Sequence, residues 1–221
     1  MNMLFKISPS SLNLMNECER CFWLTQHKVW KRPSGIFPSL PSGMDSILKK
    51  HFAKFRDKGK LPPELYNNDH CEDIKLFEDK ELLKEWQNNF KGIKWEDKEG
   101  NLLHGAIDNL LVKNEKFIVL DYKTRGFALK EDTADHYQNQ LDIYNFLLNK
   151  NGYETEDYAF LLFYVPKEVM ETGEVIFDTE LVKRKISIKN AERLFNSAIK
   201  LLNDECPDKT CLWCEVNEWK N

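Results

Sequence analysis

Apolar residues recur every three or four positions in four stretches of the chain, which predicts four amphipathic helices. Ser8 and Pro9 favour the start of the first, because serine suits the N-cap and proline the first helical position. The second begins at Gly43 and is expected to end near Gly59, ahead of two consecutive prolines. The predicted helices span residues 9–21, 43–59, 133–149 and 190–202.

Between the second and the last of these helices, several stretches have the pattern of strands. A continuous apolar run from Ala159 to Val165 predicts a strand that is buried on both faces of a sheet. Helices and strands alternate without a linker or an internal repeat, so we expect a single α/β domain. The predicted strands span residues 94–97, 102–112, 117–123 and 158–165, with one or two more within 175–188.

The composition excludes several classes of protein. With 42% hydrophobic and 31% charged residues, the 221-residue chain is neither disordered nor collagenous. Its longest strongly apolar run has seven residues, whereas a membrane span needs about 20, and the N-terminus lacks the pattern of a secretory signal. We therefore expect a cytoplasmic protein without a membrane partner. The net charge of −4 argues against a broadly basic surface, but a local basic strip such as residues 49–60 can still contact phosphates.

Charged residues interrupt two neighbouring strands in the middle of the chain. In Phe117–Lys123, Asp121 and Lys123 fall on the face that begins with apolar residues. If the preceding strand forms a hairpin with this one around residues 114–115, Asp108 faces position 121 or 122. Two carboxylates then meet beside a lysine, which suits Mg²⁺ or Mn²⁺ and attack of water on phosphorus. The simpler alternative is an ordinary ion pair at the end of a strand.

Cysteines gather near both ends of the chain, in the pairs Cys18-x-x-Cys21 and Cys211-x-x-Cys214. Two such pairs complete a tetrahedral metal site, and in a reducing compartment they are not expected to form disulfides. Spacing alone does not choose between zinc and an iron–sulfur cluster, because both accept four thiolates. The alternative is a set of buried, reduced cysteines that pack as small apolar residues. Cys71 stands alone and is expected only to pack.

Three motifs in order carry a resemblance to a known family. They are Gly105-Ala-Ile-Asp108, Asp121-Tyr-Lys123 and Gln140-Leu-Asp-Ile-Tyr144. Together they resemble the G-x-x-D strand, the D/E-x-K strand and the Q-x-x-x-Y helix of the PD-(D/E)XK (restriction-endonuclease-like) superfamily. More narrowly, the chain resembles the RecB-like exonucleases, including the CRISPR-associated exonucleases that carry an iron–sulfur cluster.

The resemblance implies roles for these residues. Asp108 and Asp121 would bind Mg²⁺ or Mn²⁺ together with the backbone carbonyl of Tyr122, and Lys123 would be catalytic. On the helix that follows, the pair Gln140 and Tyr144 would support the site and contact DNA. Residues 1–221 would then form one RecB-like nuclease domain with an α/β core, a mixed central sheet flanked by helices. Both cysteine segments would join in one metal centre.

The sequence departs from the family pattern in two places. The acid or histidine that often completes the metal site from an N-terminal helix is not obvious, and Asp45 and His51 are the two candidates. The cluster-bearing relatives commonly use one N-terminal and three C-terminal cysteines, whereas this chain has two pairs and an extra Cys206. We favour the two pairs as ligands, with Cys206 as a substitute. The resemblance favours a [4Fe–4S] cluster, and the symmetric pairs leave zinc open.

The function expected from the resemblance is metal-dependent hydrolysis of DNA, as an exonuclease on single-stranded or end-bearing DNA in repair, recombination or CRISPR-type processing. The expected partners are DNA and a helicase or CRISPR integration protein. The alternatives are an inactive DNA-binding module of the same fold and a structural metal-binding protein. Cleavage polarity, exonuclease against endonuclease action and the preference for DNA over RNA stay open.

Overall fold

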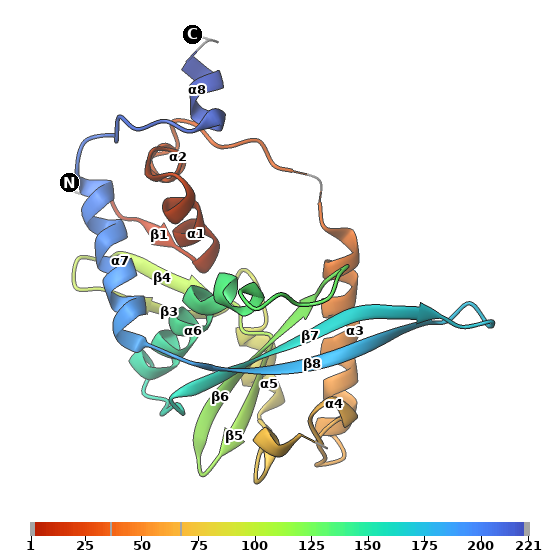
Figure 1. Ribbon diagram of the computed structural model, residues 1–221. Helices are drawn as coiled ribbons and strands as arrows, with labels where there is room; N and C mark the ends of the chain where they lie inside the picture. Colours follow the sequence, from red (N-terminus) through yellow and green to blue (C-terminus); the bar gives the residue numbers. More distant parts are fainter. Residues whose placement is uncertain (1–2, 36, 67, 219–221) are drawn as a thin grey trace.

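The computed structural model describes residues 3–35, 37–66 and 68–218, which fold into an α/β structure (Figure 1). Among these residues a five-stranded sheet has the order β2-β5-β6-β7-β8, and a three-stranded sheet has the order β1-β4-β3. The helices are α1 (Pro9–Glu17), α2 (Glu19–Gln26), α3 (Ser39–Arg56), α4 (Pro63–Tyr66), α5 (Lys80–Trp86), α6 (Gln138–Lys150), α7 (Ile188–Asn203) and α8 (Leu212–Glu218). The strands are β1 (Lys6–Ile7), β2 (Lys75–Leu76), β3 (Ile93–Glu96), β4 (Leu102–Gly105), β5 (Asn109–Lys113), β6 (Lys116–Thr124), β7 (Tyr158–Val169) and β8 (Val175–Lys185).

The five-stranded sheet is mixed, as the resemblance implies. β6 runs parallel to β7 and antiparallel to β5. Asn114 and Glu115 turn the β5–β6 hairpin with positive φ angles of 48° and 65°, which match the twist of the two strands. Asn109 consequently lies opposite Leu120. This register is the one expected from the sequence, and it places residue 108 beside residue 121.

Helices cover both faces of this sheet. On one face, alternate residues such as Val119 and Leu161 pack in a core with α1, α5, α6, α7 and the three-stranded sheet. On the other face, Leu120 and Leu162 pack against α3 and α4. The apolar run in β7 is therefore buried on both sides, as expected from its lack of alternation. Past this covered part, β7 and β8 continue as an exposed two-stranded ribbon (Figure 1).

Two predicted elements are wrong because each one divides, and the helix expected over residues 133–149 is a 3-10 helix over Thr133–Tyr137 and an α-helix only from Gln138. The helix expected over residues 9–21 breaks at Cys18, whose extended backbone ends α1 and caps α2. The strand expected over residues 102–112 divides into β4 and β5, which belong to different sheets. Between them, the N–H of Ile107 donates a hydrogen bond to the carbonyl of Trp86 in α5, so the chain leaves one sheet before it enters the other.

Within the part of the chain that the structure describes, no helix combines the length and the apolar character needed to cross a membrane.

Candidate active site and cysteine cluster

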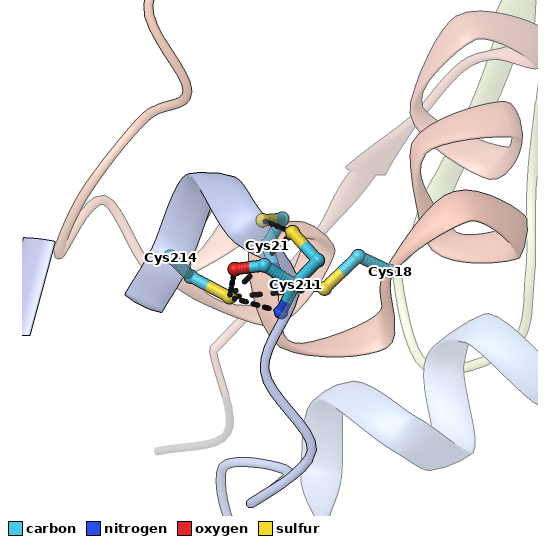
Figure 2. A group of neighbouring side chains, drawn as sticks. All are labelled: Cys18, Cys21, Cys211 and Cys214. Atoms are coloured by element: carbon cyan, nitrogen blue, oxygen red, sulfur yellow. Dashed lines mark hydrogen bonds between the residues drawn. The ribbon is translucent and has the colours of Figure 1, made fainter. Parts of the chain in front are cut away.

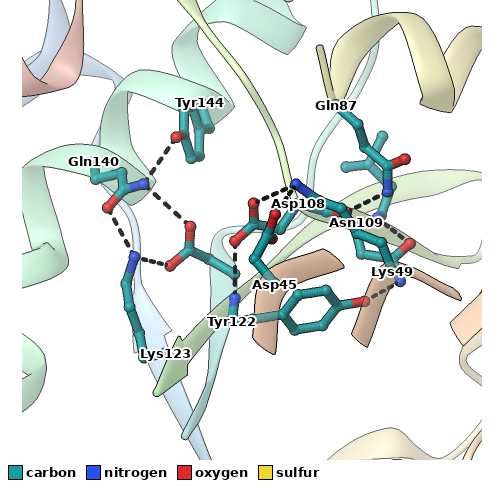
Figure 3. A network of polar contacts seen from close by, with 11 residues as sticks. Asp45, Lys49, Gln87, Asp108, Asn109, Tyr122, Lys123, Gln140 and Tyr144 are labelled. Carbon is teal, nitrogen blue, oxygen red and sulfur yellow. Dashed lines mark hydrogen bonds and ion pairs between the residues drawn. The ribbon is translucent and has the colours of Figure 1, made fainter. Parts of the chain in front are cut away.

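Two strands bring two carboxylates to one end of the five-stranded sheet. Asp108 directly precedes β5, and Asp121 lies near the end of β6. Because β5 and β6 are antiparallel, the start of one lies beside the end of the other. The backbone N–H of Tyr122 donates a 3.1 Å hydrogen bond to Oδ2 of Asp108 (Figure 3). This bond holds the Asp108 carboxylate next to the strand that carries Asp121.

Asp121, Lys123 and Gln140 contact one another between β6 and α6. The Lys123 ammonium lies 2.5 Å from Oδ2 of Asp121 and donates a 3.1 Å hydrogen bond to Oε1 of Gln140. The amide nitrogen of Gln140 donates to Oδ1 of Asp121 over 3.1 Å. The Lys123 ammonium also lies 4.5 Å from the centroid of the Tyr137 ring. The two strand residues therefore share one face, and α6 fixes both of them through one glutamine.

Tyr144 supports Gln140 from one turn further along α6. The Gln140 amide nitrogen lies 2.8 Å from the Tyr144 hydroxyl (Figure 3), and Tyr144 is only 5% exposed. The Tyr144 ring packs against Gly105 at the end of β4, where a Cβ atom would lie 2.6 Å from Cε1 of the ring. The glycine of the G-x-x-D motif thus leaves the space that the supporting tyrosine fills.

A third carboxylate, Asp45, reaches the site from α3. The ammonium of Lys49 lies 2.8 Å from Oδ2 of Asp45 and 3.4 Å from Oδ1 of Asp108, so it links the two acids (Figure 3). His51 contacts a different acid, because its Nε2 lies 3.1 Å from Oε1 of Glu64. Of the two residues expected to complete the site, the structure links Asp45 to Asp108 and pairs His51 with Glu64.

Lys49 and Gln87 belong to the site, although the sequence analysis does not assign them to it. Lys49 falls in the strip expected to contact phosphates, yet its ammonium lies between two carboxylates. Its spacing of four residues from Asp45 on one helix is a signal that could have revealed the pair. Gln87 donates a 2.6 Å hydrogen bond to the backbone carbonyl of Asp108. Arg56 of the same strip also points inward and donates to Oδ1 of Asn109. The exposed lysines of the strip are Lys50, Lys54, Lys58 and Lys60.

The donor atoms of this site suit a hard divalent cation. Asp45, Asp108 and Asp121 offer carboxylate oxygens, which Mg²⁺ and Mn²⁺ prefer. Within the described residues, Oδ2 of Asp121 is buried and accepts no hydrogen bond of good geometry, although it faces the Lys123 ammonium. Lys49 and Lys123 offset part of the negative charge of these three carboxylates. The residues therefore fit Mg²⁺ or Mn²⁺.

Residues 6–219 match the family profile described as the PD-(D/E)XK nuclease superfamily. The chain belongs to this superfamily. A search of curated proteins finds no match. A solved structure described as "Crystal structure of SSO0001" has 14% sequence identity and a TM-score of 0.45, with 95% of this chain and 81% of that chain covered. Membership of the superfamily supports the assignment of this protein as a hydrolase that acts on nucleic acids. Nucleases of this superfamily typically use divalent metals.

Burial and neighbouring charges set the protonation states of the superfamily's motif residues. Burial raises the pKa of Asp108 to about 6, and the charge of Asp121 acts in the same direction. Burial acts to lower the pKa of Lys123, but the charges of Asp121 and Asp108 outweigh it and hold that pKa above its ordinary value. Lys123 therefore carries its proton at neutral pH, whereas Asp108 is ionised only when the pH exceeds about 6.

Metal binding is expected to weaken about tenfold per pH unit as the pH falls below about 6, because a proton then competes for the Asp108 carboxylate. The same raised pKa stabilises the metal-free fold while the proton is bound, and this contribution is lost as the pH rises through about 6. Titration of Mn²⁺ into the protein between pH 5 and pH 7.5, followed by calorimetry, measures the first effect. A manganese affinity that does not change over this range would contradict it.

The substitution Asp45→Asn is expected to weaken Mn²⁺ binding by about tenfold to a hundredfold, because the site loses the charge that reaches it from α3. The matched variant His51→Gln lies on the same helix and is expected to change the affinity by less than about twofold. Electron paramagnetic resonance of Mn²⁺ measures free and bound ion in both variants. If His51→Gln weakened Mn²⁺ binding more than Asp45→Asn did, the residue of α3 that supports metal binding would be His51 instead of Asp45.

Gly105→Ala is expected to destabilise the fold by about 1–3 kcal/mol, because the new Cβ overlaps the ring of the buried Tyr144. Displacement of this ring also disturbs Gln140, so cleavage is expected to slow. Gly43→Ala on α3 is the matched control, since no heavy atom lies within 4 Å of its Cβ position. Urea unfolding measures the free energy of unfolding of both variants. Equal values would show that the Tyr144 ring moves aside without a loss of stability.

Cysteines from both ends of the chain meet at one point beside α2 and α8 (Figure 2). The Sγ atoms of Cys18 and Cys214 are 3.9 Å apart, those of Cys21 and Cys211 are 3.5 Å apart, and those of Cys211 and Cys214 are 3.7 Å apart. All four sulfurs lie within 4.8 Å of one another. The structure thus brings together the two C-x-x-C pairs favoured from the sequence, as a set that could hold a metal.

The other two cysteines lie outside this group. The Sγ of Cys206 is 3.7 Å from Nη1 of Arg20, and Cys71 packs in the core on the α3 face of the sheet. Cys206, the expected substitute, therefore contacts an arginine instead of the four sulfurs. Each cysteine pair begins just before a helix, because Cys18 caps α2 and Cys211 directly precedes α8. Backbone N–H groups at a helix start favour thiolates.

Proposed function

We propose that this protein is a Mg²⁺- or Mn²⁺-dependent deoxyribonuclease that hydrolyses phosphodiester bonds. The observation that carries the proposal is the convergence of Asp108, Asp121 and Lys123 at one end of the sheet, with Gln140 fixing the last two. The superfamily supports nuclease activity. A bound divalent ion would polarise the phosphate and activate water, and Asp45, Asp108 and Asp121 would hold it, together with the backbone carbonyl of Tyr122.

Lys123 acts in this proposal as a positively charged donor. In the metal-free protein the charges of Asp121 and Asp108 hold its pKa above the ordinary value, so the side chain is an ammonium at neutral pH. Asp121, Gln140 and the Tyr137 ring hold it in one place. Such a preorganised cation stabilises the negative charge that develops on phosphate oxygens and can orient the attacking water.

The finer assignment is an exonuclease that acts on DNA with a free end, in repair, recombination or CRISPR-type processing. The resemblance of the three motifs to those of RecB-like exonucleases supports it. The same resemblance supports a helicase or an integration protein as the partner that delivers DNA. It also supports one nuclease domain whose two cysteine segments share a metal centre.

Cleavage of matched substrates tests this assignment. Linear single-stranded DNA, linear duplex, covalently closed circular DNA and RNA of one sequence are incubated with Mg²⁺ or Mn²⁺ and with EDTA. We expect shortening of the linear DNA only with metal, and intact circles. Rapid cleavage of circles would show an endonuclease. Binding of DNA without cleavage of any substrate would support the inactive module instead.

A further inference from the structure

We propose that the four cysteines hold a single tetrahedral zinc ion in place of the [4Fe–4S] cluster that the RecB-like resemblance implies. The proposal rests on the separation of the sulfurs and on which cysteines are present, and it does not depend on the nuclease assignment. The ligands are Cys18 and Cys21 at the start of α2, and Cys211 and Cys214 at the start of α8.

The distances between the sulfurs match the coordination shell of one ion. Thiolates bind zinc at about 2.3 Å, and the corners of a tetrahedron of that radius are about 3.8 Å apart. Three of the six separations are 3.5, 3.7 and 3.9 Å, and none of the six exceeds 4.8 Å. The four sulfurs would therefore need only small shifts to surround a common centre.

A four-iron cluster makes a different demand on the same side chains. Each of its four thiolates binds a different iron, so the irons and the bridging sulfides lie between the ligands. The cysteine sulfurs must then stand further apart than the ligands of one shared ion. Here all four lie within 4.8 Å of one another, so a cluster would require the two C-x-x-C pairs to separate.

The space around the sulfurs also favours one ion. A groove of about 460 Å³ lies next to the site, between residues 15–19 and residues 209–211. Of the four cysteines, Cys18 and Cys211 line it, whereas Cys21 is fully buried and Cys214 is 2% exposed. A cluster placed in this groove would thus lack two of its ligands.

The ligand count and the surrounding charge suit a closed structural site. Cys206 contacts Arg20 and lies outside the group. Among the described residues the group therefore has four thiolates, the number that one tetrahedral ion binds. Four thiolates and Zn²⁺ carry a net charge of −2, and the Arg32 guanidinium lies 3.8 Å from Sγ of Cys211. Zinc sites with four protein ligands have no open position for substrate. The ion would hold the C-terminal segment against α2.

The decisive experiment measures metal and sulfide in wild-type protein purified anaerobically from cells supplied with both iron and zinc. We expect colourless protein with about one zinc per chain and no acid-labile sulfide. X-ray absorption at the zinc edge is expected to show four sulfur neighbours at about 2.3 Å. Brown protein with several irons and equivalent sulfide would overturn the proposal, as would one iron without sulfide or protein that contains neither metal.

Variants separate this proposal from the nuclease assignment. Cys18→Ser and Cys214→Ser are expected to lose zinc, while Cys206→Ser keeps it. Asp121→Asn is expected to keep its zinc although it loses cleavage, because the two sites use different residues. Should the cysteine variants fail to fold, the composition and absorption spectrum of the wild type still decide the question. Zinc retained in full by folded Cys214→Ser would exclude the four-thiolate site.

Discussion

Replacing Lys123 with methionine is expected to slow DNA cleavage by about a hundredfold to a thousandfold. Methionine keeps much of the length of the side chain but removes the ammonium that lies 2.5 Å from Asp121 and 3.1 Å from Gln140. The loss corresponds to about 3–4 kcal/mol of transition-state stabilisation. Single-turnover cleavage of labelled single-stranded DNA with saturating Mn²⁺ measures the rate.

The control for this variant is Lys116→Met, at the exposed start of the same strand. It removes the same charge and leaves the site untouched, so its rate is expected to stay near that of the wild type. Circular dichroism and thermal unfolding show whether both variants fold. If folded Lys123→Met cleaves as fast as Lys116→Met, Lys123 has no role in the chemistry.

Removal of the proposed zinc ion is expected to have the largest effect on stability. Structural zinc sites contribute about 10–16 kcal/mol of apparent binding free energy, which is comparable to the whole stability of a domain, at about 5–15 kcal/mol. For Cys21→Ser we expect the melting temperature to fall by about 20 °C or more, since each kcal/mol shifts it by about 2–4 °C in a chain of this size.

Cys206→Ser serves as the matched control, because Cys206 lies near the other cysteines but outside their group. Its melting temperature is expected to stay close to that of the wild type. Scanning calorimetry with and without a zinc chelator compares the two variants. A Cys21→Ser protein as stable as Cys206→Ser, and unaffected by chelator, would show that no metal stabilises the fold.

Much of the arrangement of β5 and β6 could be predicted from local sequence. The alternation in Phe117–Lys123 places Asp121 and Lys123 on one face, and the turn at Asn114 and Glu115 fixes which residues of β5 and β6 are opposite. These features depend on neighbours in the chain or on one hairpin. The sequence pattern therefore determines them without contacts to distant segments of the chain.

Features that depend on contacts between distant segments could not be predicted in this way. Residues 102–112 keep a strand-like composition across the point where β4 ends, and the hydrogen bond from Ile107 to Trp86 and the packing of Gly105 on Tyr144 reveal the break. Similarly, Lys49 has the pattern of a solvent-facing lysine. Its role follows from the position of α3 against the sheet, which brings it within 3.4 Å of Asp108.

We infer that the carboxylates of Asp108 and Asp121 make this protein a metal-dependent nuclease. Cleavage of one single-stranded DNA by wild-type protein and by Asp121→Asn, with Mg²⁺ or Mn²⁺ and with EDTA, tests this inference. We predict cleavage by the wild type only when the metal is present, and no cleavage by the folded variant. Cleavage by Asp121→Asn at the wild-type rate, or cleavage by the wild type in EDTA, would contradict the account.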